Sequence, residues 1–288
     1  MAFDTLIEHK EPIIVGINQD VFMQQNLAQD TEITSSLSAW NPTFTCWFPH
    51  SGGRWLNRGL IGRHSQVASS EVFSPLLISS LDDLLNLDTT FQVHKSRTQH
   101  DRRHEFEAVV KSMEVGRLYG LQRYFYELHN LNKNSAFYAA LPVGSKVSTP
   151  HFDTMSQLLP RMNLIHLVRN PIECFASLKS RSELGGDPCI AATYWLKLNY
   201  ATRQFWQTKS QQYQCVRYED LCATPKETAS TILATMNLSW EESMAAGIAE
   251  YHGRNKGIDL IERVTPDERK IIAEICAVEA ANYGYKLN

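Results

Sequence analysis

The sequence lacks the features that define several large classes of protein. Its longest uncharged apolar run, CIAATYWL at 189–196, is far shorter than a membrane span. The N-terminal stretch MAFDTLIEHKEPIIVG places charges inside what would be the apolar part of a signal peptide. No internal repeat or low-complexity tract is present. We therefore expect a soluble, cytoplasmic protein with no membrane partner.

The sequence also lacks a surplus of positive charge and any clustering of cysteines. The formal net charge is −3, so we expect no nucleic-acid partner, and any anion site must be local. Cysteines occur at 46, 174, 189, 215, 222 and 276, without a CxxC pair. They are predicted to be small buried hydrophobic residues of a reducing compartment, with neither a zinc site nor a disulfide framework.

The apolar content, in contrast, is ample for a large core. With 288 residues and 43% apolar side chains, the chain is long enough for one large α/β domain or two small ones. We favour a single domain over residues 1–288, with residues 1–42 as an N-terminal extension packed on it.

A glycine-containing turn follows the first clear strand. The β-branched and aromatic run TFTCWFP at 43–49 predicts a buried strand. Ser51, Gly52 and Gly53 then lack bulk, so the backbone can turn sharply and present consecutive N–H groups before a helix from about Arg54 to Arg63. This arrangement suits a phosphate group. It is not a Walker A motif, because the G-x-x-x-x-G-K-[ST] spacing is absent.

A second segment, at 162–181, places an arginine directly before the start of a predicted helix. The apolar run MNLIHLV ends in Arg169, and Asn170 and Pro171 are typical of an N-cap and a first helical residue. A helix N-terminus favours anions, so Arg169 is suitably placed to bind one. Ser177, two turns further on, adds a hydroxyl if it faces the same side.

Other segments complete an alternation of strands and helices. We predict a strand at 89–97, an aromatic-rich helix at 188–208, and a strand at 212–217 followed by Tyr-Glu-Asp-Leu. Thr224 and Thr265 are predicted to cap the next helices. This order predicts a parallel sheet covered on both faces by helices, with the ligand at the carboxyl ends of the strands.

Three of these motifs together resemble a known family. They resemble motifs of the sulfotransferases that use 3′-phosphoadenosine 5′-phosphosulfate (PAPS). The three motifs are Arg-Asn-Pro with a serine eight residues after the arginine, Pro49-x-Ser-Gly-x-x-Trp55, and Tyr218-Glu-Asp-Leu before Pro225. The resemblance implies a three-layer α/β/α fold with a central parallel sheet, similar to that of P-loop NTPases. It also implies PAPS as co-substrate, 3′-phosphoadenosine 5′-phosphate (PAP) as product, and no metal.

The resemblance assigns most of the candidate donor-binding residues. The first turn would hold the 5′-phosphate, Arg169 and Ser177 the 3′-phosphate, and Trp55 and Tyr218 would lie near the adenine. The 3′-phosphate would also meet a Gly-Arg-Asn-Lys-Gly segment, in which Asn255 is an insertion relative to the family; the alternative for this segment is a solvated turn. The candidate set is His50, Ser51, Gly52, Gly53, Arg54, Trp55, Arg169, Ser177, Tyr218, Arg254, Lys256 and Gly257.

Catalytic residues are less well defined. His50 stands where the family has a lysine or arginine, and either His50 or Arg54 would stabilise the leaving oxygen. The general base is either His94, at the end of the predicted strand, or Glu71. Glu71 is equally well explained as a charge at the start of a helix.

The sequence therefore predicts transfer of a sulfuryl group from PAPS to a hydroxyl of a small molecule or carrier-bound intermediate. Two alternatives stay open. A P-loop-type kinase is disfavoured by the missing Lys-Ser/Thr pair and by the lack of an obvious Mg²⁺-binding carboxylate after a strand. A catalytically inactive PAP-binding protein would keep the anion turns and lose the chemistry.

Overall fold

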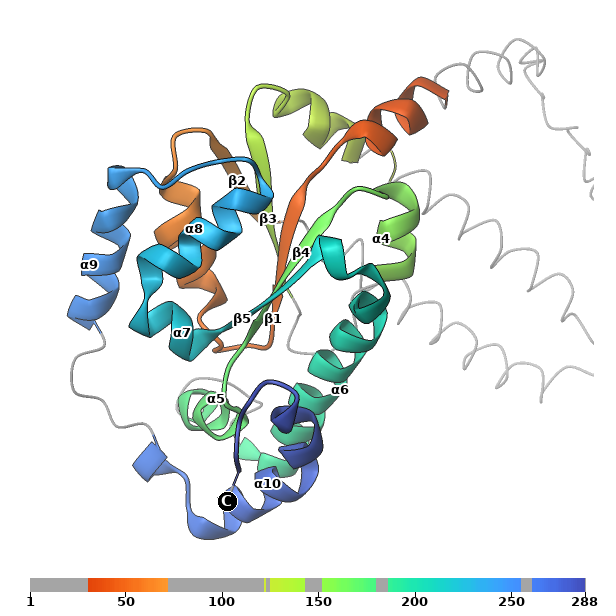
Figure 1. Cartoon of the computed structure of the whole chain (residues 1–288). Coiled ribbons are helices and arrows are strands. Elements are labelled where there is room, and N and C mark those ends of the chain that lie inside the picture. The colour runs from red at the N-terminus through yellow and green to blue at the C-terminus, as the bar shows by residue number, and fades with distance from the viewer. Residues whose placement is uncertain are drawn as a thin grey trace, which may run out of the picture.

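A parallel sheet forms the centre of the computed structural model, which describes residues 31–71, 122, 125–142, 152–179, 186–254 and 261–287. Within these residues the sheet has five strands in the order β2-β3-β1-β4-β5, and every neighbouring pair is parallel (Figure 1). The strands are β1 (Thr43–Trp47), β2 (Val67–Glu71), β3 (Ala136–Pro142), β4 (Asn163–Val168) and β5 (Tyr213–Arg217).

Helices cover both faces of this sheet, so the fold is a three-layer α/β/α arrangement, as predicted (Figure 1). One layer contains the π-helix η1 (Trp55–Leu60), the 3₁₀ turn η2 (Ile61–Arg63), α7 (Tyr218–Ala223), α8 (Pro225–Thr235), the 3₁₀ turn η5 (Glu242–Met244) and α9 (Ala245–Arg254). The other contains α4 (Phe152–Leu158), α5 (Pro171–Leu178), α6 (Pro188–Trp206) and α10 (Pro266–Ala281). Two further 3₁₀ segments, η4 (Gln207–Gln212) and η6 (Ile261–Arg263), precede β5 and α10.

Strand β4 shows how the sequence produces two cores. Alternate residues of a strand point to opposite faces. Leu164 and Val168 accordingly join the core beneath α5, α6 and α10, while Ile165 and Leu167 join the core beneath η1 and α8. Both faces are buried, which explains why the strand appears in the sequence as a continuous apolar run.

Part of the N-terminal segment belongs to the first of these cores. Residues 31–39 are helical, and Ile33 and Leu37 are buried there beside Trp40. Residues 1–30 of the segment predicted as an extension lie outside the described residues. The predicted strand at 89–97 also lies outside them.

Several local predictions are confirmed and others are wrong. Asn170 caps α5 by accepting from the Ile172 N–H (2.9 Å), and Thr265 forms a capping box with Glu268 at the start of α10. Thr224 precedes α8 but does not cap it. Its hydroxyl donates instead to the Asp220 carbonyl of α7 (3.2 Å), because the two helices follow one another without a loop.

The prediction of buried cysteines is right only in part. Cys46, Cys174 and Cys276 are buried, whereas Cys189 and Cys215 are exposed. Cys189 lies in the first turn of α6, and Cys215 lies on β5, at the edge of the sheet. Among the described helices, none is long and apolar enough to span a membrane.

Candidate active site

The turn after β1 folds into a left-handed backbone at two positions. His50 has φ +66° and Gly52 has φ +89°, and helical structure begins at residue 53. A Cβ on Gly52 would lie 2.5 Å from the ring of Tyr218, so this position requires glycine for space as well as for backbone conformation. Ser51 is fully buried between them. The N–H of Ser51 donates to the Phe48 carbonyl (3.1 Å), and the turn leads directly into a helix N-terminus, a place that favours anions.

The turn after β4 lies at the same edge of the sheet, because β1 and β4 are parallel neighbours. Asn170 and Pro171 start α5 immediately after Arg169. The order of strand addition also reverses at β1: the chain places β2 and β3 on one side of it and β4 and β5 on the other. Ligands of open α/β sheets bind at such a reversal, outside the carboxyl ends of the strands.

Arg169 connects the two turns directly. Its Nη1 donates to the carbonyl oxygen of His50 (3.0 Å), and its Nη2 donates to Oε2 of Glu173 (3.0 Å). The guanidinium carbon also lies 4.2 Å from the ring centroid of Tyr218. Burial opposes the charge of Arg169, but the neighbouring Cys174 and Glu173 side chains raise its pKa above the usual range for arginine. A fixed, permanently charged group therefore lies between the turns.

Helix α5 also contacts the first turn through side chains. Nδ1 of His50 lies 2.9 Å from Oγ of Ser177, and Oγ of Ser51 lies 3.3 Å from Sγ of Cys174. Cys174 is buried, and burial raises the pKa of its thiol to about 12, so it is uncharged at neutral pH. The structure thus brings His50, Ser51, Arg169 and Ser177 into one cluster.

Tyr218 and the residue after it support both turns. Tyr218 begins α7 directly after β5, and its ring lies between Gly52 and the guanidinium of Arg169. Oε1 of Glu219 accepts from the N–H of Asn170 (3.1 Å). Tyr218 therefore packs against both turns and supports them. Its predicted place near the adenine stays a prediction.

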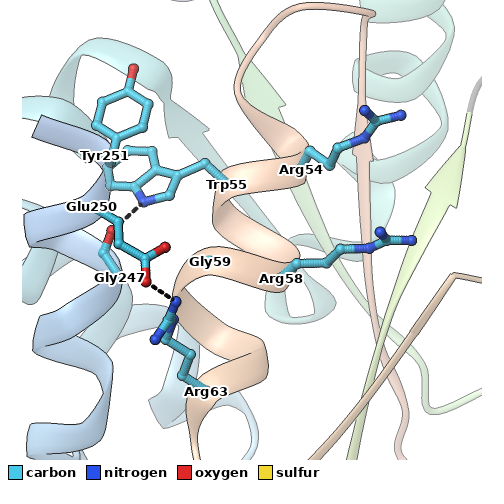
Figure 2. A pocket seen from close by; sticks show the side chains of 8 residues that line it. All are labelled: Arg54, Trp55, Arg58, Gly59, Arg63, Gly247, Glu250 and Tyr251. Carbon is cyan, nitrogen blue, oxygen red and sulfur yellow. Dashed lines mark hydrogen bonds and ion pairs between the residues drawn. The ribbon is translucent and has the colours of Figure 1, made fainter. Parts of the chain in front are cut away.

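Trp55 lies on the outer side of the first turn. Its indole stacks on Tyr251 of α9, with ring centroids 3.7 Å apart and an interplanar angle of 13°, and its Nε1–H donates to the Gly247 carbonyl (3.1 Å; Figure 2). The predicted contact of Trp55 with an adenine stays a prediction. In the structure, the face of the indole turned to α9 is covered by Tyr251.

The remaining predicted residues can be placed only in part. Glu71 is the last residue of β2, and the segment after it, which would form the predicted helix, lies outside the described residues. Arg254 is the last residue of α9. Lys256, Gly257 and the candidate base His94 lie outside the described residues. Among the residues that are described, no group of three or more His, Cys, Asp or Glu side chains is placed to hold a metal ion.

Sequence reasoning missed Glu173 and Tyr251. Glu173 had a signal, because a carboxylate four residues after Arg169 on a helix is positioned to pair with it. Tyr251 had no such signal, because the residue that it contacts, Trp55, is 196 positions earlier in the chain.

The fold is an α/β sheet that places these two turns side by side at one edge. A family model described as "Sulfotransferase family" matches residues 42–242, and the chain belongs to that family. No curated protein matches the sequence of this chain.

Solved structures show the same fold at low sequence identity. The sulfotransferase domain of the Synechococcus PCC 7002 olefin synthase is 16% identical with a TM-score of 0.54, covering 86% of this chain and 97% of its own. The sulfotransferase domain from the curacin biosynthetic pathway is 14% identical (TM-score 0.50; 86% and 99%). Sulfotransferase STF9 of Mycobacterium avium is 12% identical (TM-score 0.51; 91% and 82%).

Proposed function

We propose that this protein transfers a sulfuryl group from PAPS to a hydroxyl of a small molecule or a carrier-bound intermediate. The observation that carries the proposal is the direct link between the two anion turns: Arg169 donates to the His50 carbonyl, and His50 lies against Ser177. Two anion sites joined in this way suit one ligand with phosphate groups at both ends. An adenosine with 5′- and 3′-phosphate groups is such a ligand.

The backbone of the first turn supports a role in holding the 5′-phosphosulfate. Gly52 and Gly53 let the chain pass close to Tyr218 and Trp47: a Cβ on Gly53 would lie 2.0 Å from the Trp47 indole. A turn so free of side chains can approach a phosphate with its N–H groups. On the other side of the cluster, Arg169 and Ser177 would hold the 3′-phosphate.

The reaction would be an in-line displacement. The acceptor oxygen forms a bond to sulfur while the bond between sulfur and the bridging phosphate oxygen breaks, and PAP leaves with the electron pair. The acceptor proton passes to a general base, for which His94 and Glu71 are the candidates. His50 or Arg54 would stabilise the charge that develops on the leaving oxygen, since preorganised donors at that position lower the barrier.

Binding of PAP and transfer of labelled sulfate test the proposal together. Arg169→Ala should weaken PAP binding by roughly 100-fold or more in calorimetry, because charge-assisted bonds are lost at the 3′-phosphate. His94→Ala should bind PAP normally and transfer no ³⁵S-labelled sulfate.

Two controls make the result decisive. Arg161→Ala removes an exposed arginine at the amino end of β4, the opposite edge of the sheet, and should change neither measurement. Ser177→Ala leaves the buried charge in place and should weaken PAP binding less than Arg169→Ala. Normal PAP binding by a folded Arg169→Ala protein would refute the site. PAP binding without transfer to any hydroxyl would favour the inactive PAP-binding alternative.

A further inference from the structure

A carboxylate of the chain itself lies on the arginine that we propose for the 3′-phosphate. Both Nε and Nη2 of Arg169 donate to the same oxygen of Glu173, Oε2, at 3.2 and 3.0 Å. Glu173 follows Arg169 by four residues and belongs to the first turn of α5. The start of a helix favours negative charge, and in α5 Glu173 supplies that charge.

Arg169 needs such a partner while no ligand is bound. Its side chain is buried, and a buried charge that loses its partner destabilises the folded protein. The carbonyl of His50 accepts one hydrogen bond from Arg169 but carries no charge. Glu173 therefore stabilises the folded protein, and the Arg169–Glu173 pair contributes no net charge to the proposed phosphate site.

These contacts do not use every donor of the guanidinium. An arginine side chain has five N–H groups, and three of those of Arg169 donate to Glu173 and His50. Nη1 and Nη2 each keep one N–H that has no partner among the described residues. A phosphate can therefore reach Arg169 while Glu173 is still bound to it. Two anions would then share one guanidinium, and like charges at such short range repel each other.

Glu173 is also the carboxylate that a ligand could displace from this turn. Within the described part of the chain, Arg169 is its only hydrogen-bond partner, and its side chain is 26% exposed, so water can solvate it when it turns away. Glu219, the other carboxylate beside the turn, is held at both oxygens. Its Oε1 accepts from the Asn170 N–H and its Oε2 from the Tyr285 hydroxyl.

We infer that Glu173 lowers the affinity of the site for the 3′-phosphate, because it offsets the charge of Arg169 and repels the phosphate that binds there. The inference rests on the proposed function and adds to the donor site a residue whose effect has a defined sign. PAP keeps the 3′-phosphate after transfer, so Glu173 also speeds release of the product. The residue thus stabilises the protein without ligand and weakens its complex with PAP.

Glu173→Gln separates these two effects, because glutamine keeps an acceptor for Arg169 and removes the charge. The variant should bind PAP about tenfold more tightly in calorimetry, since the repulsion is gone. Without ligand it should unfold at a lower urea concentration, since a buried arginine has lost its opposite charge. The affinity for AMP, which lacks the 3′-phosphate, should change by less than about twofold.

Two further variants are the controls. Glu227 lies in α8 at the equivalent position, two residues after the proline that starts the helix; it is exposed, and it forms no ion pair with any described residue. Glu227→Gln should change neither PAP affinity nor the urea midpoint. Glu173→Asp keeps the charge on a shorter side chain and should bind PAP within about twofold of the unaltered protein.

The sign of the change in PAP affinity decides the result. Weaker PAP binding by folded Glu173→Gln would show that Glu173 only positions Arg169, and would overturn the inference, as would unchanged binding. An equal gain for AMP would overturn it too, because the effect would not involve the 3′-phosphate. Failure of the proposed function itself looks different: PAP would bind neither the unaltered protein nor the variant, and both proposals would fall.

Discussion

Arg169 has a structural role that its proposed role in binding the 3′-phosphate would build on. It is only 8% exposed, and its neighbours are a backbone carbonyl, a carboxylate and an aromatic ring. Glu173 and the His50 carbonyl hold the guanidinium in place before any ligand arrives. A lysine at this position would keep the charge but not the planar fork that meets several partners at once.

His166 is a second buried polar residue with defined partners. The Nδ2 of Asn199 donates to the Trp195 carbonyl (2.7 Å), so Oδ1 of Asn199 faces Nε2 of His166 (2.8 Å) and accepts its hydrogen. Nδ1 of His166 then accepts from the Tyr213 hydroxyl (2.7 Å). Burial lowers the pKa of His166 to about 4, and the Asn199 bond offsets only part of this effect. The imidazole is therefore neutral in the folded protein.

This environment predicts an acid-dependent loss of stability. An unfolded histidine titrates near pH 6.5 and the folded one near pH 4, so the unfolded state binds more protons in this window and the free energy of unfolding decreases as the pH falls through it. The loss should reach about 3 kcal/mol at most. Urea unfolding at pH 7 and pH 5 measures it, with His166→Asn as the control that lacks the titrating group. Equal pH slopes for the two proteins would exclude His166 as the cause.

The turn after α10 supports the start of α5, a contact that the sequence did not predict. Gly284, with φ +77°, turns the chain after α10, and the Tyr285 hydroxyl donates to Oε2 of Glu219 (2.6 Å). The other oxygen of Glu219 accepts from the N–H of Asn170, directly after Arg169. The end of the described chain is thereby connected to the turn after β4 through one carboxylate.

Removing that hydroxyl should loosen the turn. The hydroxyl lies against the Glu219 carboxylate and also 3.2 Å from the Val168 carbonyl. Tyr285→Phe is therefore expected to lower the free energy of unfolding by about 2 kcal/mol and to weaken PAP binding by roughly fivefold in calorimetry. Tyr283→Phe is the matched control, because its hydroxyl donates to Glu279, away from Arg169 (2.8 Å). If both variants weaken PAP binding equally, the effect is general destabilisation and not positioning of Arg169.

The sequence predicted those elements whose signals are local. The strand and cap around Arg169 and Asn170, the helix predicted at 188–208 and observed at Pro188–Trp206, and the cap at Thr265 all follow from residues a few positions apart. Strands β2 and β3 were not predicted: β2 is short and partly polar (VASSE), and β3 runs into Pro142. The pairing of Trp55 with Tyr251 and the packing of Tyr218 on Gly52 depend on tertiary contacts that no local pattern encodes.

For the whole molecule, the parallel sheet brings distant turns to one edge. Residues 50–53 and 169–177 are more than a hundred positions apart, and the register of β1 with β4 places them together. The site proposed for PAP depends on this arrangement, because a single ligand can contact both turns only if they lie at the same edge of the sheet.

A ligand with both phosphate groups should therefore stabilise the folded protein most. At 100 times its dissociation constant, PAP should raise the free energy of unfolding by about 2.7 kcal/mol. AMP lacks the 3′-phosphate and at the same concentration should raise it far less, because it has no group for Arg169. Differential scanning calorimetry measures both. Equal stabilisation by the two nucleotides would show that Arg169 does not bind a 3′-phosphate.

The close approach of Gly52 to the ring of Tyr218 restricts how this site can be redesigned. Engineering a larger residue into the first turn would demand a smaller one after β5, and that second change would remove the ring on which the Arg169 guanidinium lies. Replacing one turn alone by that of a relative would thus disturb the other, and the two segments are best exchanged as a matched pair.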